Sequence, residues 1–370
     1  MKKRTYFCFL IIACVMLTAF AQRKAAVYAD GSTPEPTLGA SGRVRLTVTG
    51  KYEDDGFQGK VLKAKAVYDD EYFYYTESAA YEPGEYEQGG LARLSMLASA
   101  TAYKGKYAKK LLTDCGFSNV KYIKAEVTEE DNDHVSFAMG MKTVGEDAIV
   151  AVLIRGTGSD YEWISNFNLG AGDVHSGFSN AEQELNKKLN SYLRKHPVKG
   201  DIRFWVTGHS RGAAVGNLLA KRLTDQYGRE HVYAYTFGTP RVAVTSTSIG
   251  YENIFNYLNP GDIVTEVAPE KWNYGRFGID KTLTADTKAA MEKAFKKKTG
   301  QSYGGFTAEE KQALLDTLLF TAGLEQDAYQ MLQILAYAIL SRLNGDETFQ
   351  YKFVHAHCPT AYICWLNAMY

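Results

Sequence analysis

The sequence has no surplus of charge of either sign, because 42 lysine and arginine residues are balanced by 42 aspartate and glutamate residues. A balanced chain lacks the basic footprint of a nucleic-acid-binding protein, so we expect no nucleic-acid partner. Internal repeats and low-complexity tracts are also absent. With 45% hydrophobic and 13% aromatic residues, the composition is that of a globular protein and excludes a disordered one.

Cysteine is scarce, and it does not support a disulfide framework. Two of the five cysteines lie near the N-terminus, which leaves Cys115, Cys358 and Cys364. An odd number of cysteines excludes complete pairing, and either one bridge with one free thiol or three free thiols fits. No C-x-x-C or H-E-x-x-H pattern occurs, so we expect neither a metal site nor a cofactor.

The N-terminus has the pattern of a signal peptide. Residues 2–4 are basic, residues 5–21 are uncharged and mostly apolar, and an A-x-A cleavage site ends at Ala21. A second site would end at Ala29. An uncleaved membrane anchor is the alternative, although the stretch is short for a spanning helix. Cleavage after Ala21 leaves a net charge of −3, so we expect a secreted protein without electrostatic attraction to anionic membranes.

Composition divides the rest of the chain into regions. Residues 22–42, rich in Gly, Pro, Ser and Thr, predict a flexible leader. Residues 43–80 predict a small N-terminal β-region of edge strands. Residues 81–370 form the main domain, and 281–350 are a helix-rich insertion within it. The insertion carries a capping box at 307–310 and a second apolar helix pattern through 331–340.

In the main domain, apolar runs alternate with helical patterns. This alternation predicts an α/β fold with a mainly parallel central sheet, flanked by helices on both faces. We expect strands at 135–141, 148–154, 202–207, 232–237 and 254–258, and helices at 91–112, 179–195 and 211–227.

The pentapeptide 208–212, Gly-His-Ser-Arg-Gly, has the pattern G-x-S-x-G. A strand pattern precedes it and a helix pattern follows it, which is the context of a nucleophile elbow. The glycines allow a tight turn, since a Cβ at either position would collide with the neighbouring strand or helix. We therefore expect Ser210 to be a nucleophile. The pattern alone also fits a Gly-rich turn with a capping serine. The choice between the two depends on whether the chain offers a histidine and an acid as partners for Ser210.

A serine nucleophile needs a histidine base that a carboxylate orients. After an elbow in this kind of sheet, the partners follow in the order Ser, acid, His. Of seven histidines, only His355 and His357 lie in that window. We favour His357, which precedes an apolar helix at 360–366, over His355, which lies closer to an extended segment at 351–354. The alternative for either histidine is a structural one, in which it lies in a loop with its hydrogen bonds satisfied.

Asp262 is the preferred acid. It follows a turn just after the strand at 254–258, at the carboxyl edge of the sheet, where open α/β sheets bind their ligands. Asp225 falls on the solvent side of a helix, and Glu266 and Glu270 lie further from the strand end. The alternative for Asp262 is a turn-forming residue.

Two backbone amides are candidates for an oxyanion hole. Arg211 begins a helix directly after the nucleophile, and Thr157 lies in a Gly-rich turn at 155–159 after a strand. Thr157 can offer its hydroxyl as well as its amide. The alternative for this turn is a phosphate-binding loop, but no G-K-[ST] follows it.

Taken together, these motifs resemble the class 3, fungal-lipase-like family of the α/β-hydrolase superfamily. The resemblance covers the chain from about residue 91 to the C-terminus, apart from the insertion at 281–350. In chain order, the segments that carry it are 154–157 (Ile-Arg-Gly-Thr), 163–164 (Trp-Ile), 174–178 (Val-His-Ser-Gly-Phe), 208–212, 237–242 (Phe-Gly-Thr-Pro-Arg-Val), 259–264 (Asn-Pro-Gly-Asp-Ile-Val), and His357 with Tyr362 beyond it.

The resemblance implies an α/β-hydrolase fold and hydrolysis of carboxylic esters through an acyl-enzyme, as in lipases and esterases, triacylglycerol lipases included. It implies Ser210, Asp262 and His357 as the triad and the amides of Thr157 and Arg211 as the oxyanion hole. It also implies an acyl-ester or lipid substrate and a transient contact with a lipid interface.

The sequence also departs from the family. Family lipases often carry a helical lid soon after the first oxyanion turn, whereas residues 160–172 are short and polar here. We hypothesise that the insertion at 281–350 is the cap of the acyl pocket, with ordinary packing on the sheet as the alternative. A catalytically inactive interaction protein on the same fold, or an acyltransferase, are the alternative functions. The substrate and the oligomeric state stay open.

Overall fold

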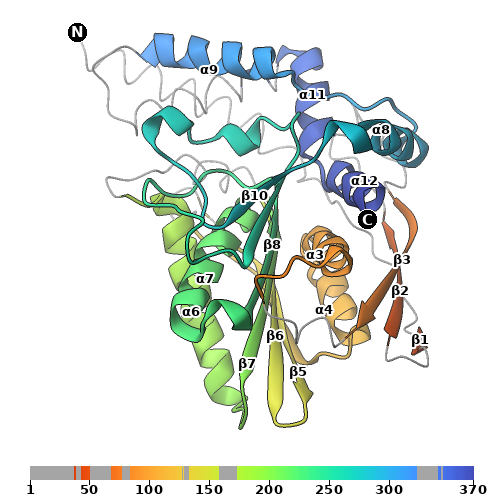
Figure 1. The fold of residues 1–370 in the computed structure, drawn as a ribbon, viewed down its shortest axis with the longest axis vertical. Coiled ribbons are helices and arrows are strands. Elements are labelled where there is room, and N and C mark those ends of the chain that lie inside the picture. The colour runs from red at the N-terminus through yellow and green to blue at the C-terminus, as the bar shows by residue number, and fades with distance from the viewer. Residues whose placement is uncertain are drawn as a thin grey trace.

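The structure, a computed structural model, describes residues 37–38, 43–50, 68–76, 84–126, 128, 133–157, 173–322, 341–342 and 345–370. Its elements form a seven-stranded sheet with helices on both faces and a separate three-stranded sheet (Figure 1). The predicted signal peptide, most of the predicted leader, the polar segment 160–172 and the helix pattern at 331–340 lie outside the described residues.

The small sheet is antiparallel and contains β1 (Thr37–Leu38), β2 (Arg43–Gly50) and β3 (Tyr68–Thr76), in that order. It lies beside α3, away from the ends of the large sheet's parallel strands (Figure 1). The boundaries of the N-terminal region at 43–80 and of the main domain at 81–370 stay predictions.

The large sheet has the order β10-β9-β8-β7-β6-β5-β4. The five strands from β6 to β10 are parallel to one another, while β5 runs antiparallel to both of its neighbours, β6 and β4. The prediction of a mainly parallel sheet is thus confirmed. The strands are β4 (Ser118–Ile123), β5 (Phe137–Val144), β6 (Asp147–Ile154), β7 (Ile202–His209), β8 (Val232–Phe237), β9 (Ile254–Leu258) and β10 (Ile279–Thr282).

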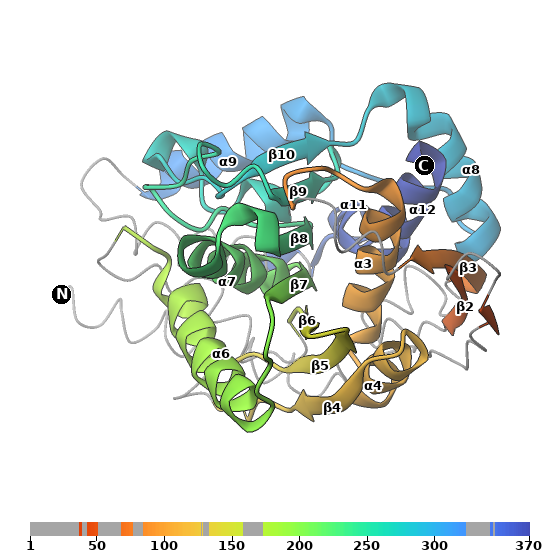
Figure 2. The ribbon, with the colours of Figure 1, turned by 60° about the horizontal axis from the view of Figure 1, so that its bottom comes forward.

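Alternate side chains of the strands face two different cores. On β6, Ile149, Ala151 and Leu153 belong to one hydrophobic cluster, and the intervening residues belong to the other. Two helices, α6 (Ser176–Lys195) and α7 (Arg211–Tyr227), cover one face. The opposite face is covered by α3 (Gly89–Thr101), α4 (Gly105–Asp114) and α12 (Pro359–Met369), as Figure 2 shows.

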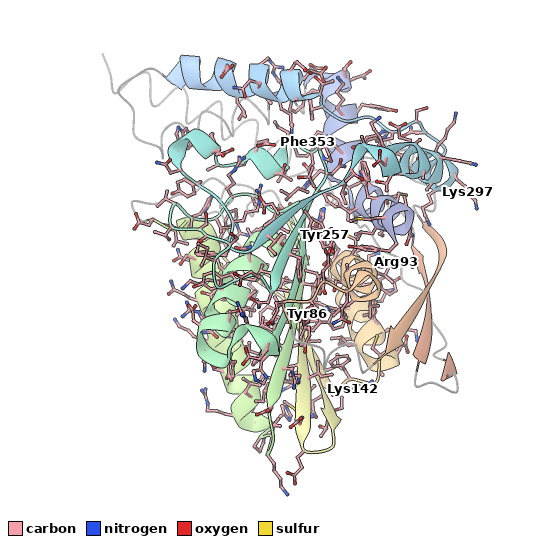
Figure 3. All side chains as sticks on the ribbon, in the orientation of Figure 1. Tyr86, Arg93, Lys142, Tyr257, Lys297 and Phe353 are labelled. Atoms are coloured by element: carbon pink, nitrogen blue, oxygen red, sulfur yellow. The ribbon has the colours of Figure 1, made fainter. Side chains whose placement is uncertain are left out.

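The carboxyl ends of the parallel strands point toward the helices of the predicted insertion and toward α11 (Glu347–His357). The insertion contributes α8 (Ala285–Thr299) and α9 (Ala308–Ala322). Its first two residues, 281 and 282, belong to β10 and so to the sheet. In Figure 3, Lys142 marks the hairpin end of the sheet and Phe353 of α11 marks the opposite end. Three short 3-10 turns complete the described elements, at Arg229–His231, Val264–Glu266 and Glu270–Trp272.

Three local expectations differ from the structure. The helix expected at 91–112 is interrupted between α3 and α4, where Gly105 leaves room for the Tyr122 ring; a Cβ there would lie 2.5 Å from it. The edge strands β4 and β10 were not predicted. The sequence of β4 shows no clear strand pattern of apolar residues, because none of its side chains is fully buried. The segment 351–354, expected to be extended, is helical within α11.

The helical character of 351–354 has a readable cause. Asp346 caps α11 by accepting hydrogen bonds from the amides of Thr348 and Phe349, each 2.9 Å long. Phe349, Phe353 and His357 then recur at i, i+4 and i+8 along its buried side. The predicted capping box of α9 is present as well: the Thr307 amide donates to Glu310, and the Glu310 amide donates to the Thr307 hydroxyl.

Candidate active site

Ser210 lies in a tight turn between β7 and α7. Its backbone has φ 58° and ψ −128°, a conformation that non-glycine residues rarely adopt. The Ser210 amide donates to the Phe237 carbonyl over 2.9 Å, and the Ser210 carbonyl accepts from the first turn of α7. Strand, strained turn and helix together have the backbone geometry expected of a nucleophile elbow.

The two glycines of the pentapeptide are required by close approach of the backbone. A Cβ on Gly208 would lie 2.2 Å from the Gly212 carbonyl oxygen in α7. A Cβ on Gly212 would lie 2.5 Å from the carbonyl oxygen of Ile154 at the end of β6. Any side chain at either position would push the helix away from the strand ends, so the turn cannot form without both glycines.

Asp262 lies in the turn after β9 and is completely buried. Its Oδ2 accepts a hydrogen bond from His357 Nδ1 at 2.8 Å and one from the Tyr362 hydroxyl at 2.7 Å. Its Oδ1 accepts from the Val264 amide at 2.9 Å. Burial alone would raise the pKa of Asp262, but the His357 charge and these hydrogen bonds outweigh it and hold the pKa below its usual value.

His357 is the last residue of α11, and its imidazole joins the other two groups. Its Nε2 lies 2.8 Å from Ser210 Oγ, while its Nδ1 faces Asp262. Ser210 is 5% exposed and His357 is 7% exposed. The structure thus brings the three residues that the sequence singled out into one chain of hydrogen bonds, with the histidine in the middle.

Tyr362 and Gly238 complete this cluster, and sequence reasoning assigned a role to neither. The Tyr362 hydroxyl accepts from the Asn259 amide and donates to Asp262. Burial next to this carboxylate raises the pKa of Tyr362 well above its usual value, so the phenol keeps its proton. A Cβ on Gly238 would lie between 3.1 and 3.3 Å from Tyr362, Asp262 and His357 at once. The tyrosine five residues beyond the histidine in the sequence was the available signal.

The second candidate histidine, His355, is separate from the cluster. Its Nε2 lies 3.1 Å from Gln301 Oε1, and its ring packs against Phe295 of α8 with ring centroids 5.0 Å apart. Burial lowers the pKa of His355 to about 3, so it is uncharged at neutral pH. Its partners belong to the insertion, and the structure therefore brings only His357 to Ser210.

Both candidates for the oxyanion hole lie at the same sheet edge as Ser210. Arg211 is the first residue of α7, and its amide is one of the N-terminal groups for which a helix has no internal acceptor. Its side chain is buried against the start of α6, where it donates to the Gly177 carbonyl over 3.3 Å. Thr157 follows β6, whose last residue, Ile154, pairs with Gly208.

The described residues contain no group of three or more side chains suited to a metal ion. Within the same residues, Cys115, Cys358 and Cys364 are free and buried, which leaves three thiols and no bridge among them. Burial raises the pKa of each thiol to about 12, so none offers a thiolate at neutral pH. None of the described helices has the length and apolar character needed to cross a membrane.

A cavity of about 390 Å³ lies between α9 and the loop that follows Asp262. Its lining includes Arg241, Glu266, Glu270 and Gln312. Glu266 accepts from Arg241 over 2.9 Å and from Lys311 of α9 over 2.8 Å. These charged walls do not suit an acyl chain, but the ion pairs tie α9 to the loop that carries Asp262.

Comparison with known proteins supports the family resemblance for part of the chain. Residues 151–272 match the family model described as Lipase (class 3). The resemblance noted in the sequence is thereby confirmed for this segment, and the structure confirms the α/β fold with a mainly parallel sheet. The segment that matches the class 3 lipase model includes Ser210 and Asp262, whereas His357 lies beyond it.

Two curated relatives match parts of the chain. It is similar to the toxin TseL of Vibrio cholerae, with 31% identity over 118 residues, which is 31% of this chain and 18% of that protein. It is also similar to the secreted mono- and diacylglycerol lipase 1 of Fusarium solani, with 34% identity over 103 residues, which is 25% of this chain and 30% of the relative. The chain thus matches less than a third of the length of either relative.

Solved lipase structures are more distant. The lipase from Rhizopus microsporus var. chinensis has a TM-score of 0.41 and 21% identity, and the match covers 57% of this chain and 76% of that one. A triacylglycerol lipase whose catalytic centre is described as a serine protease triad has a TM-score of 0.40 and 19% identity, with 54% of this chain and 80% of that one covered.

Proposed function

We propose that this protein is a serine hydrolase that cleaves carboxylic esters, of the lipase or esterase type. The observation that carries the proposal is the continuous set of hydrogen bonds from Ser210 through His357 to Asp262. A hydroxyl that touches an imidazole, itself oriented by a buried carboxylate, is the arrangement that activates a serine. The match of residues 151–272 to the class 3 lipase model supports the same reaction.

In the proposed reaction, His357 Nε2 takes the proton of Ser210 as Oγ attacks the ester carbonyl. The amides of Thr157 and Arg211 stabilise the negative charge that develops on the carbonyl oxygen. The tetrahedral intermediate collapses, the C–O bond breaks, and His357 gives its proton to the leaving alcohol. Water then attacks the acyl-enzyme with His357 again as the base, which releases the carboxylic acid and restores Ser210.

Asp262 and Tyr362 keep His357 ready for both steps. Because Asp262 Oδ2 accepts from Nδ1, the neutral imidazole carries its proton on Nδ1 and presents the Nε2 lone pair to Ser210. The Tyr362 hydroxyl donates to the same oxygen and the Val264 amide donates to the other. The carboxylate is therefore ionised and fixed without taking a proton itself.

The proposed substrate is an acyl ester of lipid type, met in a transient contact with a lipid interface. One curated relative is named as a mono- and diacylglycerol lipase, and we extend that substrate class to this chain. We also propose secretion after removal of residues 1–21. N-terminal sequencing of the exported protein tests this: a start at residue 22 or 30 supports it, whereas an intact Met1 indicates an anchor.

We further propose that α9 is part of a cap over the acyl pocket. Another helix of the insertion, α8, places Met291 and Phe295 in the core, so it is a packing element. Lys311→Glu would break the ion pair between α9 and Glu266 and should change the preferred acyl chain length. Lys288→Glu on the exposed side of α8 is the matched control. An unchanged chain-length profile in a folded Lys311→Glu protein would contradict the cap.

Ser210→Ala tests the central proposal. Without the hydroxyl, ester hydrolysis should fall by about 10⁴-fold or more while the protein stays folded. Ser179→Ala on the surface of α6 is the control. The measurements are rates on soluble and emulsified esters of several chain lengths, and labelling by a fluorophosphonate probe, which needs an activated serine.

The alternatives give different results in this experiment. Full activity of Ser210→Ala would remove the proposed nucleophile. A wild-type protein that neither hydrolyses esters nor takes up the probe would be the inactive interaction protein. A wild-type protein that takes up the probe but transfers acyl groups to added alcohol rather than to water would be the acyltransferase.

A further inference from the structure

His209 precedes the proposed nucleophile, and both of its ring nitrogens have partners. Nε2 lies 2.8 Å from the backbone carbonyl oxygen of His357, and Nδ1 lies 3.0 Å from the Tyr103 hydroxyl. The side chain is 1% exposed. Its ring lies against the His357 ring, with centroids 4.8 Å apart, and meets the Tyr362 ring edge-on. The proposed reaction uses none of these contacts.

The two partners determine the proton positions on His209. A carbonyl oxygen can only accept, so Nε2 must carry the proton. Nδ1 is then the acceptor, and the Tyr103 hydroxyl is the donor. Burial lowers the pKa of His209 to about 3, so the ring stays neutral over the physiological pH range. His209 is therefore a fixed polar link and not a second base.

The carbonyl that His209 binds belongs to the end of a helix. His357 is the last residue of α11, and the next residue, Cys358, leaves the helix with φ −65° and ψ 148°. The last carbonyl groups of a helix accept no hydrogen bond within the helix, so they need donors from outside it. His209 supplies such a donor at the residue whose imidazole meets Ser210. One residue thus connects the backbone of the elbow to the backbone of the base.

Tyr103 anchors the other side of this link. It lies in the short break between α3 and α4, which the sequence predicted as continuous helix. Its hydroxyl lies against Gly156, where a Cβ would come within 2.1 Å of it, next to the proposed oxyanion residue Thr157. Tyr103 therefore connects the helical break, the first oxyanion turn and His209.

We propose that His209 is a positioning residue: with Tyr103 behind it, it holds the backbone of His357 so that Nε2 stays in register with Ser210 Oγ. The inference rests on the proposed ester hydrolysis. It predicts that kcat depends on the Nε2–H donor of His209 and not on the imidazole ring itself.

Two variants of similar size separate the donor from the side chain. In His209→Gln, the amide nitrogen lies the same number of bonds from Cα as Nε2 and can donate to the same carbonyl. In His209→Met, no donor remains. Since small displacements of a catalytic group are costly, kcat of His209→Met on a soluble short-chain ester should fall by about 10- to 100-fold with KM little changed. His209→Gln should recover most of this loss.

A merely structural role gives another pattern. In that case both variants lose melting temperature to the same extent, and Gln does not rescue kcat. Equal kcat in the two variants would overturn the proposal, whether both are active or both are impaired.

Tyr103→Phe tests the second bond and does not depend on how His209→Met folds. Loss of one neutral hydrogen bond should lower kcat by about fivefold. If Tyr103 acts through His209, Tyr103→Phe should have no further effect in the His209→Met background, where the link is already lost. Effects that multiply independently would contradict the link.

The proton positions can be read without any substrate. In protein labelled with ¹⁵N-histidine, His209 should show the neutral Nε2–H form from pH 8 down to pH 5, and Tyr103→Phe should shift its Nδ1 signal. An Nδ1–H form, or titration near the ordinary histidine pKa, would overturn the positioning role. A wild-type protein without ester hydrolysis or fluorophosphonate labelling would overturn the proposed function instead, with the His209 tautomer still measurable.

Discussion

Two of the buried polar clusters on the large sheet differ in what their groups can do. The triad cluster, at the carboxyl ends of the strands, consists of Ser210, Asp262, His357 and Tyr362. The asparagine cluster consists of Thr236, Asn217 and Asn256, and lies where α7 crosses β8 and β9. All seven side chains are buried, so burial alone does not distinguish a site from a structural network.

The asparagine cluster satisfies every group and cannot exchange a proton. Asn256 Oδ1 accepts from Asn217 and Thr236, and Asn256 Nδ2 donates to the Phe277 carbonyl and to Asp280. Asn217 also bonds both backbone groups of Phe277. Amides and hydroxyls in fixed roles hold the loop before β10 against α7, so this cluster serves stability.

The triad cluster has hydrogen bonds of similar length, but it contains an imidazole and a carboxylate, which are acid–base groups. Its histidine stands between a hydroxyl and a carboxylate, each 2.8 Å away, so the Ser210 proton can pass to the imidazole without movement of either side chain. Damage to the triad cluster should therefore appear in rate, and damage to the asparagine cluster in stability. Substitutions in each cluster can test this contrast.

Asp262→Asn should have the largest effect. The amide can present its N–H to His357 and favour the wrong tautomer, so kcat for ester hydrolysis should fall by about 10⁴-fold at neutral pH. Rates on a soluble ester measure this. Asp225→Asn, at an exposed carboxylate that accepts from Lys221 and Tyr251, is the matched control. Activity near the wild-type level in Asp262→Asn would mean that another carboxylate orients His357.

The sequence predicted much of this contrast because the triad residues follow a topological rule. Parallel strands end at one edge, and the order Ser, acid, His along the chain reduced seven histidines to two. The alternating apolar runs predicted the strands on which Ser210 and Asp262 depend. These signals are local and periodic, so they can be recognised without knowledge of tertiary contacts.

What the sequence left unpredicted depends on contacts between distant segments. The choice of His357 over His355 rested on an extended segment that is in fact helical, although the favoured residue does face Ser210 in the structure. Asn217 and Asn256 lie 39 residues apart and carry no pattern of their own. The bonds of His209 to Tyr103 and to the His357 carbonyl span 106 and 148 residues. Such pairings follow from packing, which periodicity does not encode.

Asn217→Ala should have the next largest effect, and it should be on stability. It removes partners from Asn256 and from both backbone groups of Phe277, so the free energy of unfolding should fall by about 2 to 4 kcal/mol. Urea unfolding measures this, with Asn190→Ala on the surface of α6 as control. The kcat of the folded variant should stay close to wild type. A large loss of kcat with unchanged stability would end the distinction between the clusters.

Tyr362→Phe should have an intermediate effect within the triad cluster. Asp262 loses a hydrogen bond to its charged form, and the buried Asn259 amide loses its acceptor. We expect kcat to fall by about tenfold, since hydrogen bonds to charged groups are worth more than neutral ones. Tyr251→Phe, which removes a tyrosine bond to the exposed Asp225, is the control. Equal effects of the two changes would show that burial of the carboxylate adds nothing.

His355→Gln should have the smallest effect, visible only in the pH dependence of stability. His355 has a pKa of about 3 in the folded protein, whereas an unfolded histidine titrates near its ordinary value. Between these values the unfolded state binds one proton more, so stability falls as pH drops, by about 1 to 2 kcal/mol from pH 7 to pH 5. The Gln variant can still donate to Gln301 but does not titrate, so its urea unfolding curves should show a correspondingly smaller drop.

His231→Gln, outside the core, is the control. A drop as large as in the wild type would mean that His355 takes up its proton in the folded protein, which would make it a titrating neighbour of His357 and no longer a packing residue.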